Sequence, residues 1–220
     1  MTFIIADAGP NWRNLEEAKA IVRKCAYAGV DAVKFQAYKK GHPVPGHPRA
    51  AEIDAIVMTP DMARELHEEC KRAGIEFLCT AMYPEAVAWL APMVSRFKIR
   101  YADRYNMEIR NQIYKYKMDK LVITSDDNAA GPKVQGFKTL YCVPEYPPKA
   151  LPQAEWAMYD GFSSHYPDWH VPATEARHWN LEYLEVHVML DEYDGGWDPI
   201  DSAVSLSITD LKKLVKEVKG

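Results

Sequence analysis

An α/β fold, in the form of a trimmed (β/α)8 TIM-type barrel, is the architecture that this sequence predicts. Short β-rich runs alternate along the chain with segments of helical spacing. The runs are almost continuously apolar, which is typical of buried parallel strands. Eight such runs follow one another, and eight β/α units close into a barrel. Because a typical barrel needs about 250 residues, a chain of 220 residues must have shortened connections.

The expected strands are short and rich in β-branched and aromatic residues. The first, FIIADAG, is a continuous run that ends at Gly9. No linker, internal repeat or low-complexity tract interrupts the series, so we expect a single domain over residues 1–220. In chain order the expected strands cover residues 3–9, 32–38, 76–82, 96–102, 121–125, 138–143, 161–165 and 181–190.

The expected helices lie between these runs and carry end signals. Asn14 can cap the first helix, which stops at Gly29, and Thr59 followed by Pro60 can open the second. Between the fifth and sixth strands, the segment DDNAAGPKVQGF is too short and too rich in glycine for a packed helix. The expected helices cover residues 15–29, 59–74, 84–92, 106–117, 171–180 and 209–219.

Composition argues against several classes of protein. The net charge of −4 gives no reason to expect a nucleic-acid or membrane partner. The N-terminal apolar run is too short for a signal peptide or a membrane span, so we expect a cytoplasmic location. The cysteines include no CxxC pair, which indicates reduced, buried thiols. They are Cys25, Cys70, Cys79 and Cys142.

Polar side chains stand at the expected carboxyl ends of the strands, where barrels of this class hold their reacting groups. A buried lysine needs a partner or a ligand, so Lys34 in the run AVKFQ is expected to point into the site. Lysine, serine and threonine around one rim can bind an anion such as phosphate. The strand-end candidates are Asp7, Asn11, Lys34, Gln36, Thr80, Lys98, Asp103, Ser125, Glu145, Tyr146, Ser163, Ser164, His165, Glu185, His187 and Asp191.

Two histidines follow neighbouring strands, His165 in GFSSHYPDWH and His187 in LEVHVMLD. Two imidazoles can share a divalent metal and leave coordination positions open for substrate. A lone histidine in an apolar strand is also typical of a hydrogen-bonded core residue, so the residues alone leave both interpretations open. His170 and His178 are candidates for a third ligand, whereas the two histidines of GHPVPGHP are typical of a proline-rich loop.

Taken together and in order, these strand ends resemble the sialic acid synthase family, which includes N-acetylneuraminate synthase and its legionaminate, pseudaminate and spore-coat relatives. The opening IIADAGPNWRNLEEAKAIVRKCAYAGVDAVKFQAY is similar to the family's IAEIGxNHxG and AGADAVKFQ motifs. Five later segments are also similar to family motifs, so the resemblance covers nearly the whole chain. They are IEFLCTAMYPEAVAWL, FKIRYADRYN, LYCVPEYP, GFSSH and LEVHVMLD.

The resemblance implies a metal-dependent condensation of phosphoenolpyruvate with an N-acetylmannosamine-like aldose, giving a sialic-acid-type 2-keto acid and phosphate. It implies a divalent metal, Mn²⁺ before others, held by His165 and His187. It further implies that Lys34, Thr80, Lys98, Ser125 and Ser163 hold the carboxylate and phosphate. The catalytic residues that it implies are Asp7, Lys34, Lys98 and Glu185, and the substrate-binding residues are Gln36, Thr80, Ser125, Tyr146, Ser163 and Asp191.

Several departures from the family pattern surround the implied phosphate site. Aligning FKIRYADRYN with the family's yKIaSgDitN places Arg100 and Tyr101 where the family has small residues. The family's LSTGM is ITSDDN here, so Asp126 and Asp127 stand where a neutral turn would lie near a phosphate. Two added negative charges disfavour a bound anion unless they point away. Pro144 replaces a serine.

Other departures lie along the first, seventh and eighth strands and beyond them. The family's C-terminal antifreeze-like domain is expected to be absent. Since family members often pair through that domain, any homo-oligomer is expected to use another surface. The remaining departures are Asp7 for glutamate, Trp12 for histidine, Ser164 for aspartate, Val186 for lysine, and the loop YDGGWDPID, in which Asp201 is the candidate match for a family aspartate.

Two alternative functions remain open from the sequence. One is a different metal-assisted aldolase or phospho-sugar activity on the same barrel, to which Tyr101, Asp126 and Asp127 would belong. The other is a catalytically degenerate binding subunit, which loss of phosphate contacts favours. Retention of two lysines in buried strands argues against the degenerate subunit, because a site without a ligand has no evident need for them.

Overall fold

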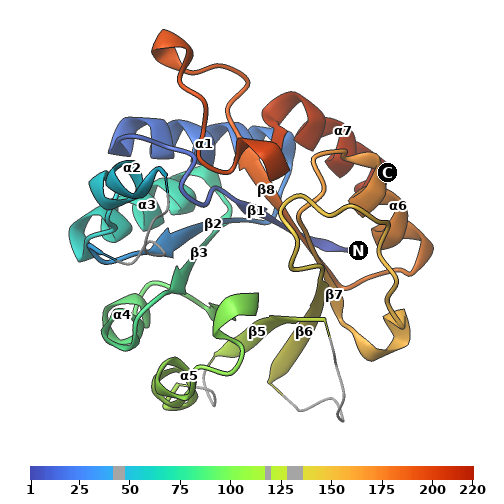
Figure 1. Ribbon diagram of the computed structural model, residues 1–220, viewed down its shortest axis with the longest axis horizontal. Helices are drawn as coiled ribbons and strands as arrows, with labels where there is room; N and C mark the ends of the chain where they lie inside the picture. The colour runs from blue at the N-terminus through green and yellow to red at the C-terminus, as the bar shows by residue number, and fades with distance from the viewer. Residues whose placement is uncertain (42–47, 117–119, 128–135) are drawn as a thin grey trace.

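The chain folds into a nearly closed eight-stranded parallel barrel, as the sequence predicts (Figure 1). The computed structural model describes residues 1–41, 48–116, 120–127 and 136–220. The strands run in the order β3-β2-β1-β8-β7-β6-β5-β4, and β3 lies beside β4 without a ladder among the described residues. The strands are β1 (Phe3–Asp7), β2 (Ala32–Ala37), β3 (Glu76–Ala81), β4 (Arg96–Ile99), β5 (Leu121–Asp126), β6 (Phe137–Cys142), β7 (Gly161–Ser164) and β8 (Tyr183–Met189).

The α-helices surround the strands, and the two helices with predicted caps, α1 and α3, begin at those caps. The Asn14 side chain accepts a hydrogen bond from the backbone N–H of Glu17, and that of Thr59 accepts one from Met62. Both caps satisfy N–H groups that the first turn of a helix leaves without partners. The helices are α1 (Leu15–Ala28), α2 (Ala50–Ala55), α3 (Pro60–Ala73), α4 (Pro84–Leu90), α5 (Met107–Tyr114), α6 (His170–His178) and α7 (Ile208–Lys219).

The observed elements differ from the expected ones in three places. A short helix, α2, and a short strand, β9 (Ser205–Ser207), which pairs with β8, were not predicted. The third difference lies between β6 and β7, where no helix was expected and the chain makes a 3₁₀ turn over Trp156–Met158. Pro144, Pro147, Pro148 and Pro152 fall in this connection, and proline disrupts helix interiors. His42 and His47 lie outside the described residues.

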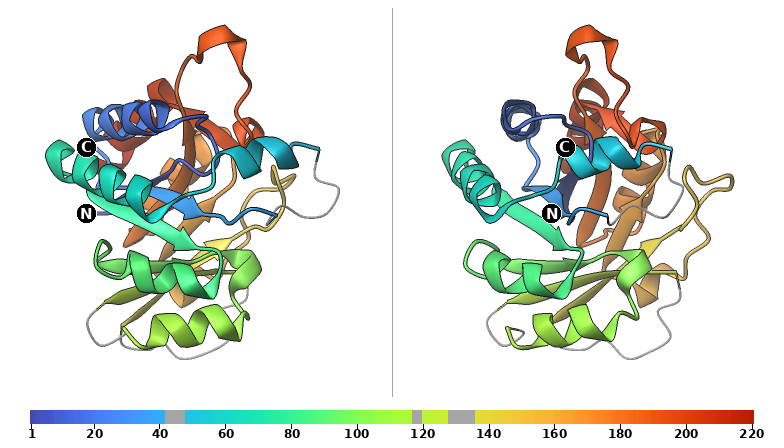
Figure 2. Two further views of the ribbon diagram at one scale, coloured as in Figure 1. Left: turned by 90° about the vertical axis from the view of Figure 1, so that its left-hand side faces the viewer. Right: turned by 60° about the vertical axis from the view of Figure 1, so that its left-hand side comes forward.

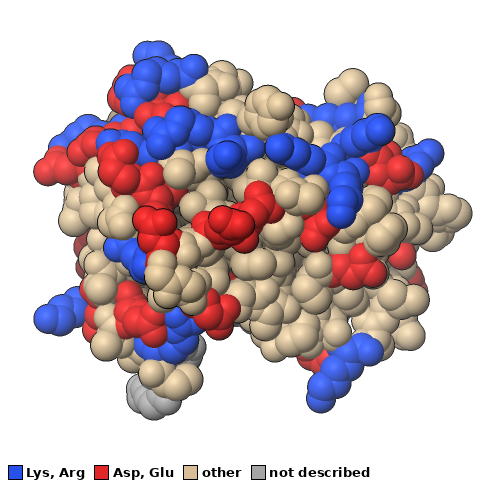
Figure 3. All heavy atoms as spheres, turned by 90° about the horizontal axis from the view of Figure 1, so that it is seen from above, with Lys and Arg blue, Asp and Glu red and all other residues tan. Residues whose placement is uncertain are grey.

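The outer faces of the strands and the inner faces of the helices form the main hydrophobic core. The four cysteines are buried and unpaired, as predicted. No helix in the described ranges is long and apolar enough to cross a bilayer. On the face seen from above in Figure 3, lysines and arginines lie among aspartates and glutamates rather than in a region of one sign.

The loop that follows β8, residues 190–204, projects from the barrel (Figure 2). Trp197 holds this loop against neighbouring elements. Its indole N–H donates to Glu52 of α2 at 3.0 Å, and the guanidinium groups of Arg13 and Arg49 lie over its ring at 5.3 and 5.6 Å. The loop returns to the barrel at Asp201, which reaches the candidate site described next.

Candidate active site

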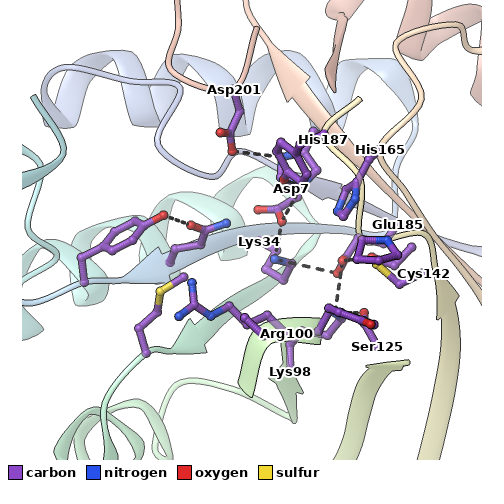
Figure 4. Close-up of a pocket in the computed structure, with 18 residues that line it drawn as sticks. Asp7, Lys34, Lys98, Arg100, Ser125, Cys142, His165, Glu185, His187 and Asp201 are labelled. Atoms are coloured by element: carbon purple, nitrogen blue, oxygen red, sulfur yellow. Dashed lines mark hydrogen bonds and ion pairs between the residues drawn. The ribbon is translucent and has the colours of Figure 1, made fainter. Parts of the chain in front are cut away.

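A cavity of about 350 Å³ opens at the carboxyl ends of the strands (Figure 4). Side chains from all eight barrel strands or the loops that follow them surround it or support it. Residues that line it are Asp7, Lys34, Gln36, Tyr38, Met82, Lys98, Arg100, Tyr101, Ala102, Ser125, Cys142, Pro144, Tyr146, Ser163, His165, Glu185, His187 and Asp201.

Strand periodicity explains why polar groups meet at this depth. Successive residues of a strand face opposite sides, so every second residue points into the barrel. Below the cavity, the interior holds an apolar cluster of Ile5, Ala32, Leu78, Ile123, Leu140 and Tyr183. Two residues further along the same strands stand Asp7, Lys34, Thr80, Ser125, Cys142 and Glu185. The apolar cluster therefore seals the barrel beneath a layer of reactive groups.

Gly161 allows β7 and β8 to approach closely at this level. A Cβ atom at this position would lie 2.2 Å from the carbonyl oxygen of Tyr183, which is inside the contact distance of two atoms. With glycine there, Ser163 reaches Glu185, and its hydroxyl donates a hydrogen bond to Oε1 at 2.8 Å.

Lys34 lies at the centre of the cavity and is 2% exposed. Its ammonium group pairs with Asp7, donates to Thr80 Oγ1 at 3.4 Å and lies 3.9 Å from Glu185 Oε2. Burial by itself lowers the pKa of Lys34, but the Asp7 and Glu185 carboxylates outweigh burial, and the pKa lies above its ordinary value. Lys34 therefore remains a cation.

Lys98, which is 3% exposed, forms the second buried cation. Its Nζ donates to Ser125 Oγ at 2.6 Å and lies 3.2 Å from Glu185 Oε1. Burial by itself raises the pKa of Glu185, but the two lysines outweigh burial and lower the pKa to about 2. Glu185 is thus ionised at neutral pH, which favours a role in orienting the lysines over a role as a resting proton donor.

His165 and His187 face each other with ring centroids 5.4 Å apart. His165 Nδ1 lies 2.8 Å from the backbone oxygen of Val143, which fixes Nδ1 as the protonated nitrogen and leaves a lone pair on Nε2. Burial and then the neighbouring His187 lower the pKa of His165 to about 4, so this ring is neutral at pH 7.

His187 has polar partners on both ring nitrogens. Its Nε2 hydrogen-bonds with the Tyr146 hydroxyl at 2.8 Å, and its Nδ1 lies 3.3 Å from Asp201 Oδ2 without the alignment of a hydrogen bond. Burial by itself lowers the pKa of His187, but Asp7 and Asp201 outweigh burial and raise it. Although Tyr146 is 51% exposed, its hydroxyl lies inside the cavity, and burial of the hydroxyl raises its pKa.

Asn11, which is fully buried, holds the returning loop in place. Its Oδ1 accepts from the backbone N–H of Asp201 at 2.8 Å, and its Nδ2 donates to Ser205 Oγ at 2.8 Å and to the Val188 carbonyl at 2.9 Å. The Ser205 hydroxyl in turn donates to the Asp201 carbonyl at 2.7 Å. This network fixes the backbone from which the Asp201 carboxylate meets His187.

The histidine pair fits a metal with two protein ligands. Within the described residues no group of three or more metal-binding side chains comes together, so His170 and His178, both exposed and outside the lining, do not complete a site. The fit rests on the donors: His165 keeps Nε2 free, and Asp201 stands beside His187 Nδ1 as carboxylates do behind many metal-bound histidines. Water or substrate would supply the remaining ligands.

Ten of the twelve predicted site residues line the cavity, and two do not. Thr80 is buried beneath the lining and accepts a hydrogen bond from Lys34, so it can affect a ligand only by positioning that lysine. The placement predicted for Asp191 is wrong: it is exposed, and its carboxylate accepts from the Thr209 N–H at the start of α7. Strand β8 ends at Met189, so Asp191 has already left the barrel interior.

The added carboxylates at the end of β5 point away from the cavity. Asp126 lies 3.3 Å from Arg104 Nε, and Asp127 accepts from the Tyr101 hydroxyl at 2.8 Å. Neither lines the cavity. Because both carboxylates point away from the cavity, their negative charges do not exclude a bound anion there.

Eight lining residues were not among the strand-end candidates: Tyr38, Met82, Arg100, Tyr101, Ala102, Cys142, Pro144 and Asp201. Period two identifies Arg100 and Cys142, which lie two residues beyond the interior positions Lys98 and Leu140. Tyr38 follows Gln36 by the same rule, and its hydroxyl donates to the Gln36 amide oxygen. Asp201 was noted as a family match, but its loop gives no local signal of its position.

Comparisons with known proteins agree with this geometry. Residues 21–130, half of the chain, match the model of the NeuB family. An N-acetylneuraminic acid synthetase from Leptospira borgpetersenii, solved in complex with citrate, shares 22% identity with a TM-score of 0.81, over 99% of this chain and 82% of that one. No curated protein matches the chain in sequence.

Two further solved structures share the fold at lower similarity. A spore coat polysaccharide biosynthesis protein from Bacillus subtilis is 22% identical with a TM-score of 0.74, over 99% of this chain and 67% of that one. A truncated 3-deoxy-D-arabino-heptulosonate 7-phosphate synthase from Thermotoga maritima is 14% identical with a TM-score of 0.66, over 99% and 85%. At these identities the likeness establishes the barrel and not the chemistry.

Proposed function

The chain belongs to the NeuB family, and on that premise we propose that it condenses phosphoenolpyruvate with an N-acetylmannosamine-like aldose, giving a sialic-acid-type 2-keto acid and phosphate. The observation that carries the proposal is the pair of buried ammonium groups, Lys34 and Lys98, at the centre of the cavity. Phosphoenolpyruvate is small and strongly anionic, and fixed cations in a site that excludes water bind such a substrate well.

The inner part of the cavity supplies the groups that phosphoenolpyruvate needs. Lys34 and Lys98 face its carboxylate and phosphate, and Ser125, whose Oγ accepts from Lys98, can donate its own O–H at the same depth. The O–H of Ser163 is donated to Glu185. Glu185 contacts Lys98, Ser163 and, at 3.9 Å, Lys34, so it orients all three donors at once. Binding therefore requires little rearrangement of the site.

In the reaction, carbon 3 of phosphoenolpyruvate forms a bond to the aldehyde carbon of the aldose. Water then adds at carbon 2, and the tetrahedral species collapses with cleavage of the bond to phosphate. A divalent metal held by His165 and His187, Mn²⁺ being our first choice, would supply Lewis-acid polarisation of the aldehyde. Asp7 and Tyr146 stand beside His187 and can orient the sugar hydroxyls and the attacking water.

The structure favours an active enzyme over a degenerate binding subunit for a physical reason. Two lysines and two carboxylates buried in one cavity are costly to keep, because removing charges from water is offset only by pairing and by a ligand. A different acceptor sugar on the same barrel is the alternative that a specific observation supports, since Arg100 and Tyr101 line the outer cavity.

Calorimetric titration of phosphoenolpyruvate, with and without Mn²⁺, tests the proposal. We expect wild type to bind phosphoenolpyruvate and Mn²⁺, and the His165→Ala/His187→Ala double variant to lose Mn²⁺ uptake. His178→Ala is the matched control, because His178 is exposed and outside the cavity. Phosphate release on adding aldoses then reports turnover. Absence of phosphoenolpyruvate binding to wild type in both conditions would refute the proposed function.

A further inference from the structure

Arg100 is a cation at the mouth of the cavity rather than at its centre. It follows β4, lines the cavity and has a side chain that is 42% exposed. Its Nε donates to Asp103 Oδ2 at 2.5 Å. Its two terminal nitrogens donate no hydrogen bond to any residue in the described ranges. One edge of a guanidinium fork therefore remains available to a ligand.

Unlike Arg100, the two lysines that line the cavity already form ion pairs with carboxylates inside it. Lys34 pairs with Asp7, and Lys98 pairs with Glu185. The carboxylate that holds Arg100, in contrast, belongs to Asp103, which does not line the cavity. Arg100 is thus anchored from outside while its charge faces inward, an arrangement suited to an incoming anion.

The direction of the side chain separates Arg100 from the inner anion site. In Figure 4, the Arg100 side chain extends away from Ser125 and Glu185. Its charge acts on the hydroxyl of Tyr38, which follows β2 across β3, and there it opposes the burial that raises the pKa of Tyr38. The Arg100 guanidinium therefore faces the outer half of the cavity. Phosphoenolpyruvate bound to Lys34 and Lys98 would occupy the inner half and leave the outer half to the second substrate.

We propose that Arg100 is a specificity-determining residue that binds an oxyanion carried by the aldose acceptor, so that the enzyme prefers an acidic aldose to a neutral one. The inference rests on the proposed function and names the substrate class of the same site. The position supports it, because a long cation replaces the small residue of the family motif at the mouth of the cavity. A guanidinium fork matches a phosphate or carboxylate through paired hydrogen bonds.

Calorimetry on metal-free protein loaded with phosphoenolpyruvate tests this inference without depending on turnover. The probes are N-acetylmannosamine, N-acetylmannosamine 6-phosphate, arabinose and arabinose 5-phosphate. We expect wild type to bind at least one phosphorylated aldose about 10- to 100-fold more tightly than its neutral partner, as a charge-assisted pair implies. In Arg100→Ala that preference should disappear, and in Arg100→Lys it should fall only in part.

Two controls separate acceptor binding from other effects. Arg64→Ala removes the same charge from an exposed position of α3, outside the cavity, and should leave the preference unchanged. Titration of phosphoenolpyruvate alone should give a dissociation constant within about threefold of wild type for every variant, which also shows that the variants fold.

The outcomes are distinct. Equal binding of neutral and phosphorylated aldoses by wild type, with phosphoenolpyruvate binding intact, overturns the inference and spares the proposed function. Loss of phosphoenolpyruvate affinity in Arg100→Ala equal to the loss of aldose phosphate affinity assigns Arg100 to phosphoenolpyruvate and also overturns it. No phosphoenolpyruvate binding by wild type overturns the proposed function, and the inference with it.

Discussion

The barrel has two unequal sides. On the covered side, β8, β1 and β2 lie under α1, α3 and α7, and nearly all their residues are buried. On the thin side, β5 and β6 are followed by no α-helix in the described part of the chain, and half or more of their residues are only partly buried. The two sides therefore differ in how firmly the core holds their side chains.

This difference matches the distribution of the site. The covered side supplies Asp7, Lys34, Glu185 and His187, where the family motifs are retained except for the shortened carboxylate. Departures there, such as Val186, are buried in the core and do not reach the cavity. Apart from Asp7, the changed residues that line the cavity of the barrel follow β4 and β6; they are Arg100, Tyr101 and Pro144. The chemistry is anchored where packing is firm, and the acceptor side varies where packing is thin.

The largest expected effect comes from the two buried lysines. Lys34→Met leaves Asp7 and Glu185 facing each other without the cation between them, so we expect a loss of about 3–5 kcal/mol of stability. Lys98→Met should cost roughly 1–2 kcal/mol less, because Glu185 keeps Lys34 and Ser163. Urea unfolding followed by circular dichroism measures both. An equal or larger loss of stability in Lys98→Met would contradict the expected difference between the covered side and the thin side. Both variants should fail to bind phosphoenolpyruvate.

A matched pair of isoleucines tests packing directly. Ile21 in α1 and Ile113 in α5 are both fully buried. Helix α1 packs between α3 and α7, whereas α5 packs mainly against α4 among the described helices. We expect Ile21→Ala to cost about 4 kcal/mol and Ile113→Ala about 2–3 kcal/mol, because a site with fewer rigid neighbours collapses more readily. Denaturant titration measures the loss of stability in each variant. A loss for Ile113→Ala as large as that for Ile21→Ala, or larger, would mean that the thin side is packed as rigidly as the covered side.

The same contrast explains what the sequence could predict. Buried parallel strands reveal themselves through continuous apolar runs, which predicted the barrel. The ten lining residues were identified as polar residues at the expected strand ends and by the resemblance to a known family. The prediction for Asp191 was wrong because the strand ends at Met189, one residue earlier than expected, and the Asp191 carboxylate accepts a hydrogen bond at the start of α7 instead. Asp201 depends on a distant loop, whose position only tertiary contacts determine, whereas Arg100 follows Lys98 by the period of two and could have been identified in the same way.

Asn11 connects the covered side to the loop that carries Asp201. Asn11→Ala removes three hydrogen bonds to buried partners and should cost about 1–3 kcal/mol. It should also weaken Mn²⁺ binding, since Asp201 would lose its fixed position beside His187. Thermal unfolding and metal titration provide the two measurements. Lost stability with unchanged Mn²⁺ affinity would show that Asn11 supports the fold without positioning the site.

The smallest expected effect compares two helix caps. Asn14 caps α1 on the covered side, and Asn106 caps α5 toward the thin side. Each asparagine accepts backbone hydrogen bonds in the first turn, so Asn14→Ala and Asn106→Ala should each cost about 1 kcal/mol if both helices unfold with the whole domain. Hydrogen exchange adds the local measurement. A smaller global cost for Asn106→Ala, together with faster exchange confined to α5, would show that this helix opens independently. The unequal packing would then extend from structure to dynamics.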